Sequence, residues 1–195
     1  DYMKKDDVIV VYTPAIPDDN IFLKYFRKNG NNQIYKRSEM LGEISKQSKC
    51  IAVAGTHGKT TTCAIISHLF HSSGIHFKAF IGGIMKCFDS NFINTGNDYI
   101  IVEADEYDRS FLNLNPNYAV ITSIESDHLD IYGDLKSLVE SFQSFTNNVK
   151  DVLITDADID IDKDFSFSIK SDSDYYVNNI NTVSYTHLRA HETRP

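Results

Sequence analysis

Residues 55–61, Gly-Thr-His-Gly-Lys-Thr-Thr, have the types and spacing of a phosphate-binding loop. They follow the apolar run 50–54, which predicts a strand, and lead into 60–73, which predicts a helix. Two glycines let the backbone turn tightly and direct its N–H groups at an anion, and the helix adds its positive N-terminus. In such loops the lysine holds the β- and γ-phosphates and the next hydroxyl ligates Mg²⁺. The predicted ATP-binding residues are Gly55, Thr56, His57, Gly58, Lys59, Thr60 and Thr61.

The spacing differs from that of the general P-loop, in which four residues separate a further glycine from the Gly-Lys pair. That glycine would fall at position 53, where this chain has Val53, so the predicted loop is a shorter form that begins at Gly55. The local pattern leaves one alternative, a glycine turn with an incidental lysine. Charged residues further along the chain argue against it.

An acidic run begins at the end of a second predicted strand, 99–103. Four of the six residues from Glu103 to Asp108 are acidic, and their charges repel one another unless cations share the site. Beside a phosphate-binding loop the natural cation is Mg²⁺, because it prefers hard carboxylate oxygens. The run therefore favours a magnesium site, with a solvated acidic loop as the alternative.

A histidine among acids follows a third predicted strand, 118–123. His128 is flanked by Asp127 and Asp130, which could orient its ring or share a metal with it. A lone histidine is more often structural, and that alternative stays open. Within the loop itself, His57 could contact phosphate or substrate.

Strands that alternate with helices position these groups. The alternation predicts an α/β fold whose parallel sheet is covered on both faces. Ligands of such sheets bind at the carboxyl ends of the strands, so the loop, Glu103 and the segment after 118–123 should meet at one edge. We expect the helix after the loop to bury Ile65, Ile66, Leu69 and Phe70. We also expect Gly82–Gly83 to end a strand at 77–81.

The order of the elements predicts three parts. Residues 1–48 read strand, helix, strand, helix, the C-terminal part of a Rossmann-like domain. Residues 49–183 read as a P-loop central domain that is incomplete. Residues 184–195 are polar and basic without periodicity, and we predict a non-native tail there. A chain that begins with Asp rather than Met is also predicted to be a fragment.

Composition excludes several classes of protein. The net charge of −8 and the lack of basic clusters before the last residues argue against a nucleic-acid partner. Three cysteines without a CxxC pair argue against disulfides or zinc and fit a reducing cytoplasm. No apolar run is long enough to span a bilayer, so we expect no membrane insertion.

Three segments together resemble the central ATPase domain of the Mur ligases, the ATP-dependent amide ligases of peptidoglycan assembly. They are Gly-Thr-His-Gly-Lys-Thr-Thr-Thr at 55–62, Glu-Ala-Asp-Glu-Tyr-Asp-Arg-Ser-Phe at 103–111 and Ile-Glu-Ser-Asp-His-Leu-Asp-Ile-Tyr-Gly at 124–133. The resemblance covers roughly residues 8–180. Upstream, Thr13–Pro17 and Lys36–Gly42 are most similar to the member that joins L-alanine to UDP-N-acetylmuramate.

The resemblance implies a reaction and its residues. ATP and the muramic carboxylate give an acyl phosphate, which the L-alanine amine attacks to leave an amide, ADP and phosphate. By motif, Lys59, Glu103 and His128 would be catalytic. Thr60 and Glu103 would ligate the Mg²⁺ that bridges ATP, and His128 would serve a second Mg²⁺. The family often has Asn where this chain has Ser123, which leaves that contact open.

The resemblance also implies parts that this chain lacks. The family has a glycine-rich UDP-binding turn before the region that matches, and a C-terminal domain that brings the amino acid. We therefore expect this piece alone to be inactive. Two other functions stay open: a related ligase that recycles a murein tripeptide onto UDP-N-acetylmuramate, and a nucleotide-binding ATPase module without ligase chemistry.

Overall fold

The computed structural model describes residues 8–28, 33–125, 134–169 and 173–177. Its strands form a two-stranded and an eight-stranded sheet. The elements of the first part are β1 (Ile9–Tyr12), α1 (Ile21–Lys28), β2 (Gln33–Lys36) and α2 (Arg37–Ser45). Those of the second part are β3 (Lys49–Ala54), α3 (Lys59–Ser72), β4 (Phe77–Met85), β5 (Ser90–Asn94), β6 (Tyr99–Glu103), the 3₁₀ helix η2 (Tyr107–Asn113), β7 (Tyr118–Ile121), α5 (Leu135–Thr146), β8 (Val152–Asp156), β9 (Phe165–Ser168) and β10 (Tyr175–Tyr176).

The larger sheet has the strand order β10-β9-β8-β7-β3-β6-β4-β5. Among the strands that the structure describes in this sheet, only the β4–β5 pair is antiparallel, so the predicted α/β fold with a parallel sheet is confirmed. β3 lies between β6 and β7, and its Val53 is level with Glu103 on one side and with Val120 on the other. The chain passes from one side of β3 to the other between β6 and β7. Open α/β sheets bind ligands at such switch points.

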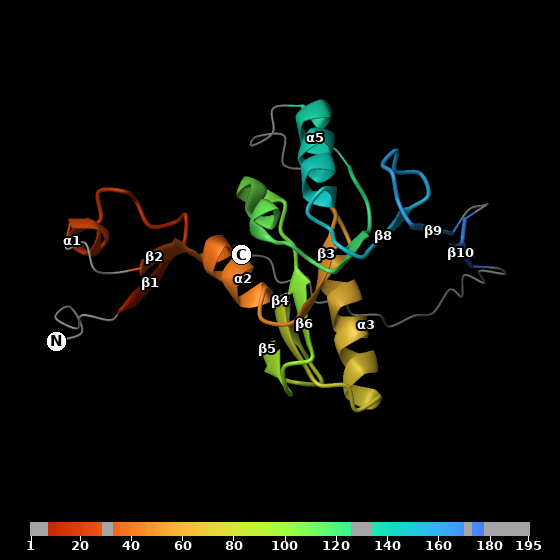
Figure 1. Cartoon of the computed structure of the whole chain (residues 1–195), viewed down its shortest axis with the longest axis horizontal. Coiled ribbons are helices and arrows are strands. Elements are labelled where there is room, and N and C mark those ends of the chain that lie inside the picture. Colours follow the sequence, from red (N-terminus) through yellow and green to blue (C-terminus); the bar gives the residue numbers. More distant parts are fainter. Residues whose placement is uncertain (1–7, 29–32, 126–133, 170–172, 178–195) are drawn as a thin grey trace.

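Two apolar cores lie on opposite faces of this sheet, because side chains alternate along each strand. Cys50, Ala52 and Ala54 of β3 face a core completed by η2 and α5. Ile51 and Val53 face the other core, completed by α3. Figure 1 shows α3 and α5 on either side of the sheet. Helices on both faces hold the strands together, so the loops at the carboxyl edge have a rigid base.

The buried face of α3 differs from the prediction. Ile65 and Leu69 are 55% and 57% exposed, so the expectation that both are buried is wrong. The inward positions are Cys63, Ile66, Ser67 and Phe70. These residues have the i, i+3, i+4, i+7 spacing of one helix face, and the small side chains at 63 and 67 let the helix lie close to the sheet.

β4 also differs from the prediction, because Gly82–Gly83 does not end it. The strand continues to Met85 and turns back into β5. The pairing of β4 with β5 shifts register between Phe80 and Met85, and glycines in strands often mark such irregularities. The glycines therefore bring the strand close to its neighbours rather than stopping it.

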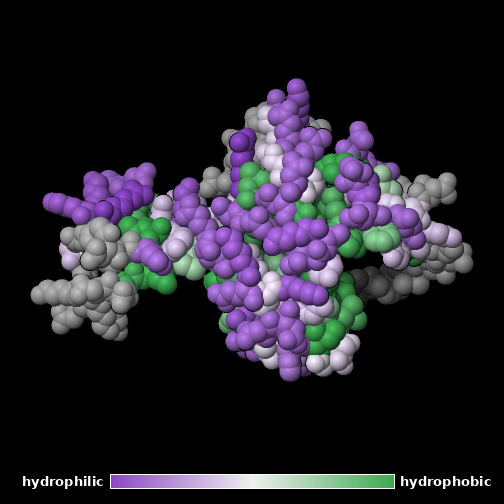
Figure 2. Space-filling view, viewed as in Figure 1, coloured by the Kyte–Doolittle hydropathy of each residue, from purple (hydrophilic) through white to green (hydrophobic). Residues whose placement is uncertain are grey.

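The small parallel sheet of β1 and β2 lies at one end of the molecule, with α2 between it and the larger sheet (Figure 1). α2 contacts η2 closely, since a Cβ on Gly42 would lie 2.5 Å from the carbonyl oxygen of Asn113. Hydrophobic surface gathers over the small sheet (Figure 2), where Ile9 and Val11 are 58% and 47% exposed. Within the described residues, no helix has the length and apolar character that crossing a membrane requires.

Candidate phosphate and magnesium site

Two glycines shape the loop between β3 and α3. The backbone angle φ is +127° at Gly55 and +81° at Gly58, values that residues with a Cβ rarely adopt. A Cβ on Gly55 would also lie 2.9 Å from the backbone nitrogen and oxygen of Ser123. Gly58 is the residue from which α3 begins. The predicted strand, glycine turn and helix are therefore present, and both glycines are needed for the turn.

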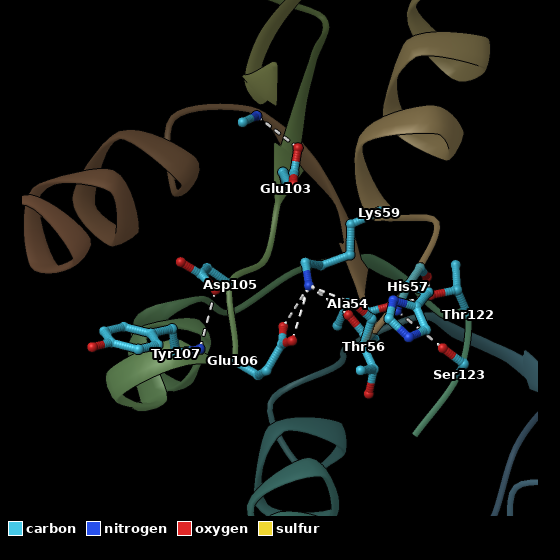
Figure 3. Close-up of polar contacts among 12 residues, drawn as sticks. Ala54, Thr56, His57, Lys59, Glu103, Asp105, Glu106, Tyr107, Thr122 and Ser123 are labelled. Atoms are coloured by element: carbon cyan, nitrogen blue, oxygen red, sulfur yellow. Dashed lines mark hydrogen bonds and ion pairs between the residues drawn. The ribbon is translucent and has the colours of Figure 1, made fainter. Parts of the chain in front are cut away.

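Hydrogen bonds tie this loop to the segment that follows β7 (Figure 3). The Thr56 N–H donates to the Ser123 carbonyl at 2.9 Å, and the Glu125 N–H donates to Thr56 Oγ1 at 2.9 Å. The His57 N–H donates to Ser123 Oγ at 3.1 Å, and the Thr122 hydroxyl donates to the His57 carbonyl. The loop conformation thus depends on the neighbouring strand, and Ser123 makes a definite contact there.

Lys59, the first residue of α3, points back across the loop toward η2 (Figure 3). Its Nζ lies 2.6 Å from the Gly55 carbonyl oxygen, and 2.9 and 2.8 Å from Oε1 and Oε2 of Glu106. The side chains of Lys59 and Glu106 are 13% and 1% exposed. This is a buried ion pair, in which each charge depends on the other because little water reaches them.

Thr60 and Glu103 come together beside the lysine. The Thr60 hydroxyl donates to Glu103 Oε1 at 2.8 Å, and the Gly82 N–H donates to Glu103 Oε2 at 2.6 Å. A Cβ on Gly82 would lie 2.8 and 3.0 Å from the two carboxylate oxygens. A side chain at position 82 would therefore push the Glu103 carboxylate from its present place. A hydroxyl and a carboxylate side by side at the end of a phosphate loop are hard oxygen donors of the kind that Mg²⁺ prefers.

The His57 side chain lies at the surface of the loop. Its Nε2 is 3.6 Å from Glu125 Oε2, and the two side chains are 64% and 62% exposed. An exposed pair of this kind contributes little to stability. The imidazole is accessible at the loop, with its side chain 64% exposed, and its contact with phosphate or substrate stays a prediction.

A cavity of about 380 Å³ adjoins Glu103. Arg37 and Ser38 at the start of α2 line it, together with Gly82 and Asp105. The segment 36–42 thus lies at the same site as the acidic run, although more than 60 residues separate them in sequence. A substrate in this cavity would lie beside the candidate magnesium ligands.

The two buried cysteines are not candidate nucleophiles. Burial raises the pKa of Cys50 to about 12. Burial, and then the charge of Glu103, raise the pKa of Cys63 well above its usual range. All three cysteines are free thiols. Since the thiolate is the reactive form, neither buried cysteine takes part in the chemistry of the site.

The structure brings together Lys59, Thr60 and Glu103, as the sequence predicted. His128, with Asp127 and Asp130, lies outside the described residues, so its role stays a prediction. In the described part of the chain, no three His, Cys, Asp or Glu side chains gather closely enough to hold a metal ion by themselves. A magnesium site here would therefore rely on the Thr60 hydroxyl, the Glu103 carboxylate and oxygens of the ligand.

Sequence reasoning missed three contributors to this site: Glu106, Gly82 and Thr122. Glu106 was one acid among four, and nothing in the spacing distinguished it as the partner of Lys59. The sequence indicates the glycine pair at 82–83 only as the end of a strand. The signal for Thr122 is its position: a hydroxyl at the carboxyl end of the predicted strand 118–123, which lies next to the strand that leads into the loop.

Comparison with known proteins decides the family. The sequence model of the Mur ligase middle domain matches residues 53–194. The chain belongs to the Mur ligase family. It is 47% identical over 153 residues to the UDP-N-acetylmuramate–L-alanine ligase of Cytophaga hutchinsonii, a match over 76% of this chain and 33% of that protein. It is 48% identical over 147 residues to the enzyme of the same name from Christiangramia forsetii, over 75% of this chain and 32% of that protein.

Solved Mur ligase structures have the same fold. The UDP-N-acetylmuramate–alanine ligase of Thermotoga maritima superposes with a TM-score of 0.74 at 29% identity, over 86% of this chain and 40% of that chain. A murein peptide ligase from Psychrobacter arcticus gives a TM-score of 0.64 at 25% identity, over 77% of this chain and 36% of that chain. This chain spans about a third of the length of the curated Mur ligases that it matches.

Proposed function

We propose that the whole protein that carries this chain is an ATP-dependent ligase of peptidoglycan precursor synthesis. It joins the carboxylate of UDP-N-acetylmuramate to the amine of L-alanine. ATP first transfers its γ-phosphoryl group to the carboxylate, which gives an acyl phosphate and ADP. The amine then attacks the acyl carbon, an amide forms, and phosphate leaves. We expect this reaction in the cytoplasm, where ATP and nucleotide sugars are available.

The observation that carries this proposal is the meeting of Lys59, Thr60 and Glu103 at the carboxyl edge of the sheet. Phosphoryl transfer is catalysed mainly by positioning and by neutralising the charge of the phosphates. Lys59 is the cation at the loop, and Thr60 and Glu103 are adjacent oxygen donors, 2.8 Å apart, that would hold Mg²⁺. When bound, Mg²⁺ neutralises charge on the phosphate oxygens.

Other residues of the chain have supporting roles in the proposal. The loop from Gly55 to Thr61 surrounds the phosphates, with the N-terminus of α3 directed at them. Gly82 holds the Glu103 carboxylate in place through its N–H, at 2.6 Å. His128 would hold a second Mg²⁺, which would neutralise charge on phosphate oxygens. The cavity beside Glu103, lined by Arg37 and Ser38, receives the end of the sugar nucleotide that carries the carboxylate.

The choice of substrates rests on the relatives. Two curated relatives at 47% and 48% identity are named UDP-N-acetylmuramate–L-alanine ligases. The murein peptide ligase from Psychrobacter arcticus is less similar, at 25% identity. A tripeptide-recycling ligase is therefore the second candidate. An ATPase module without ligase chemistry is the third, and the cavity beside the magnesium ligands argues against it.

Phosphate release from ATP by the whole protein tests the proposal. The reaction would contain UDP-N-acetylmuramate with L-alanine, with a murein tripeptide, or with neither. We expect release only with the sugar nucleotide and L-alanine together. Release that responds to the tripeptide instead would identify the recycling ligase. Hydrolysis indifferent to the sugar nucleotide would leave only the ATPase module.

A matched pair of variants links the reaction to the site. Thr60→Val removes the hydroxyl beside Glu103 and keeps the shape of the side chain, so we expect release to fall by at least about tenfold. Thr62→Val makes the same change two residues further along α3, at a hydroxyl that makes no hydrogen bond to Glu103 among the described residues. We expect nearly unchanged release in this control. Equal losses of phosphate release in both variants would mean that a disturbed α3 helix, and not the missing Thr60 hydroxyl, causes the loss.

A further inference from the structure

The ammonium group of Lys59 is already engaged by oxygens of the protein. It carries three hydrogens, and four acceptors surround it: the Gly55 carbonyl at 2.6 Å, the Thr56 carbonyl at 3.4 Å, and the two Glu106 oxygens at 2.9 and 2.8 Å. A phosphate oxygen can therefore bind Lys59 only by displacing one of these acceptors or by sharing a hydrogen with it.

Glu106 is the acceptor that matters most, because it carries the same sign of charge as a phosphate. Its side chain is 1% exposed, so water screens it poorly from anions at the loop. While the Glu106 carboxylate neutralises Lys59, the loop presents less positive charge to a polyphosphate. Both effects oppose nucleotide binding.

We propose that Glu106 is an internal competitor of the nucleotide for Lys59, and thereby sets how tightly the loop holds the terminal phosphates. In the empty loop the carboxylate keeps the buried lysine paired and the loop in shape. When ADP or ATP binds, its phosphates take hydrogens of Lys59 from Glu106. When the phosphates leave, Glu106 pairs with the lysine again, which favours release of ADP. This inference rests on the proposed nucleotide site and concerns the affinity of that site.

Glu106 acts through Lys59, so it is a positioning residue rather than a catalytic one. Its effect should depend on which phosphates the ligand has. Lysines of such loops reach the β- and γ-phosphates, so ADP competes with Glu106 directly. AMP has only the α-phosphate and does not compete. A carboxylate with a purely structural role would affect both nucleotides equally, because loss of loop order weakens every contact.

Calorimetric titration of the whole protein with ADP and with AMP, in the presence of Mg²⁺, tests the inference in Glu106→Gln. The amide keeps the size of the side chain and one acceptor for Lys59 but removes the charge. We expect the dissociation constant of ADP to fall by about tenfold, since a hydrogen bond to a charged group is worth roughly that factor. We expect the AMP constant to change by less than about twofold.

Asp105→Asn is the matched control. This variant removes one negative charge from the residue next to Glu106, in the turn between β6 and η2. The Asp105 carboxylate accepts from the Tyr107 N–H rather than from Lys59. We expect little change in ADP affinity. Equal tightening in Glu106→Gln and Asp105→Asn, equal tightening of ADP and AMP, or no tightening of ADP in Glu106→Gln would each overturn the inference.

A second variant, Glu106→Asp, tests the same inference if Glu106→Gln folds poorly. Glu106→Asp retains the charge but withdraws it from Lys59 by one methylene, and we expect a smaller tightening of ADP with AMP unaffected. Unchanged or weaker ADP binding in this variant would also count against competition. If the unaltered protein binds no ADP, the nucleotide site itself is refuted. If it binds ADP and the variants do not differ from it, only the role of Glu106 is refuted.

Discussion

The lysine of the phosphate loop should stabilise the empty fold, because it is the partner of a buried carboxylate. Lys59→Ala leaves Glu106, 1% exposed, without the cation that lies 2.8 Å from its carboxylate. Breaking a buried ion pair in this way costs about 3–5 kcal/mol, since the remaining charge loses its cation and is poorly hydrated. Lys59 is itself only 13% exposed, so the small contribution to stability that is typical of surface ion pairs does not apply here. We expect a loss of about 3 kcal/mol or more in the free energy of unfolding without nucleotide.

Thermal unfolding of the whole protein, followed by circular dichroism without nucleotide, measures this loss. At about 2–4 °C per kcal/mol for a domain of this size, the melting temperature should fall by at least about 6 °C. Lys136→Ala is the control, because Lys136 and Glu140 form a surface pair at 3.8 Å with side chains 84% and 59% exposed. We expect that control to lose less than about 0.5 kcal/mol.

The double variant Lys59→Ala/Glu106→Gln separates charge from packing. Removing the carboxylate charge should restore a large part of the stability lost in Lys59→Ala, because a neutral amide is far less costly to bury unpaired. The reasoning would be refuted if Lys59→Ala had the same melting temperature as the unaltered protein. It would equally be refuted if the double variant were no more stable than the single one, since the loss would then arise from the missing lysine stem.

Three further outcomes follow from the site. Gly82→Ala would place a Cβ 2.8 and 3.0 Å from the Glu103 oxygens, so we expect the Mg²⁺ concentration needed for half-maximal ADP binding to rise by about tenfold. An unchanged Mg²⁺ dependence would show that Glu103 does not act through the metal. Thr122→Val removes the hydroxyl that donates to the His57 carbonyl, and we expect a loss of about 1–2 kcal/mol in unfolding experiments; equal stability would mean that the loop does not need this tie. In the native protein iodoacetamide should modify Cys87, which is exposed, and spare the other two cysteines, which are buried. Peptide mass mapping would check this, and modification of all three without denaturant would contradict the burial.

The sequence predicted the architecture of the site because its signals are local. An apolar run, two glycines, a lysine and a helix-forming stretch identify the turn at 55–61 from neighbouring residues alone, although its conformation also depends on hydrogen bonds to the segment after β7. Parallel pairing then carries the end of 99–103 to the side of the loop, so Thr60 and Glu103 could be expected to meet. These are the contacts that the structure contains, at 2.8 Å. The role of His128 remains a prediction.

Only the tertiary structure decided which acid pairs with Lys59 and what Gly82 does. The sequence alone does not show which of the four acids of 103–108 pairs with Lys59. The turn into η2 buries Glu106 beside the lysine and leaves Asp105 beside the cavity. Gly82 acts on Glu103 because β4 and β6 are neighbours in the sheet. Periodicity in the sequence identifies which face of a helix or strand is buried. It does not identify the residue of another element that contacts this face, because such contacts depend on strand register and on how tightly the chain turns between elements.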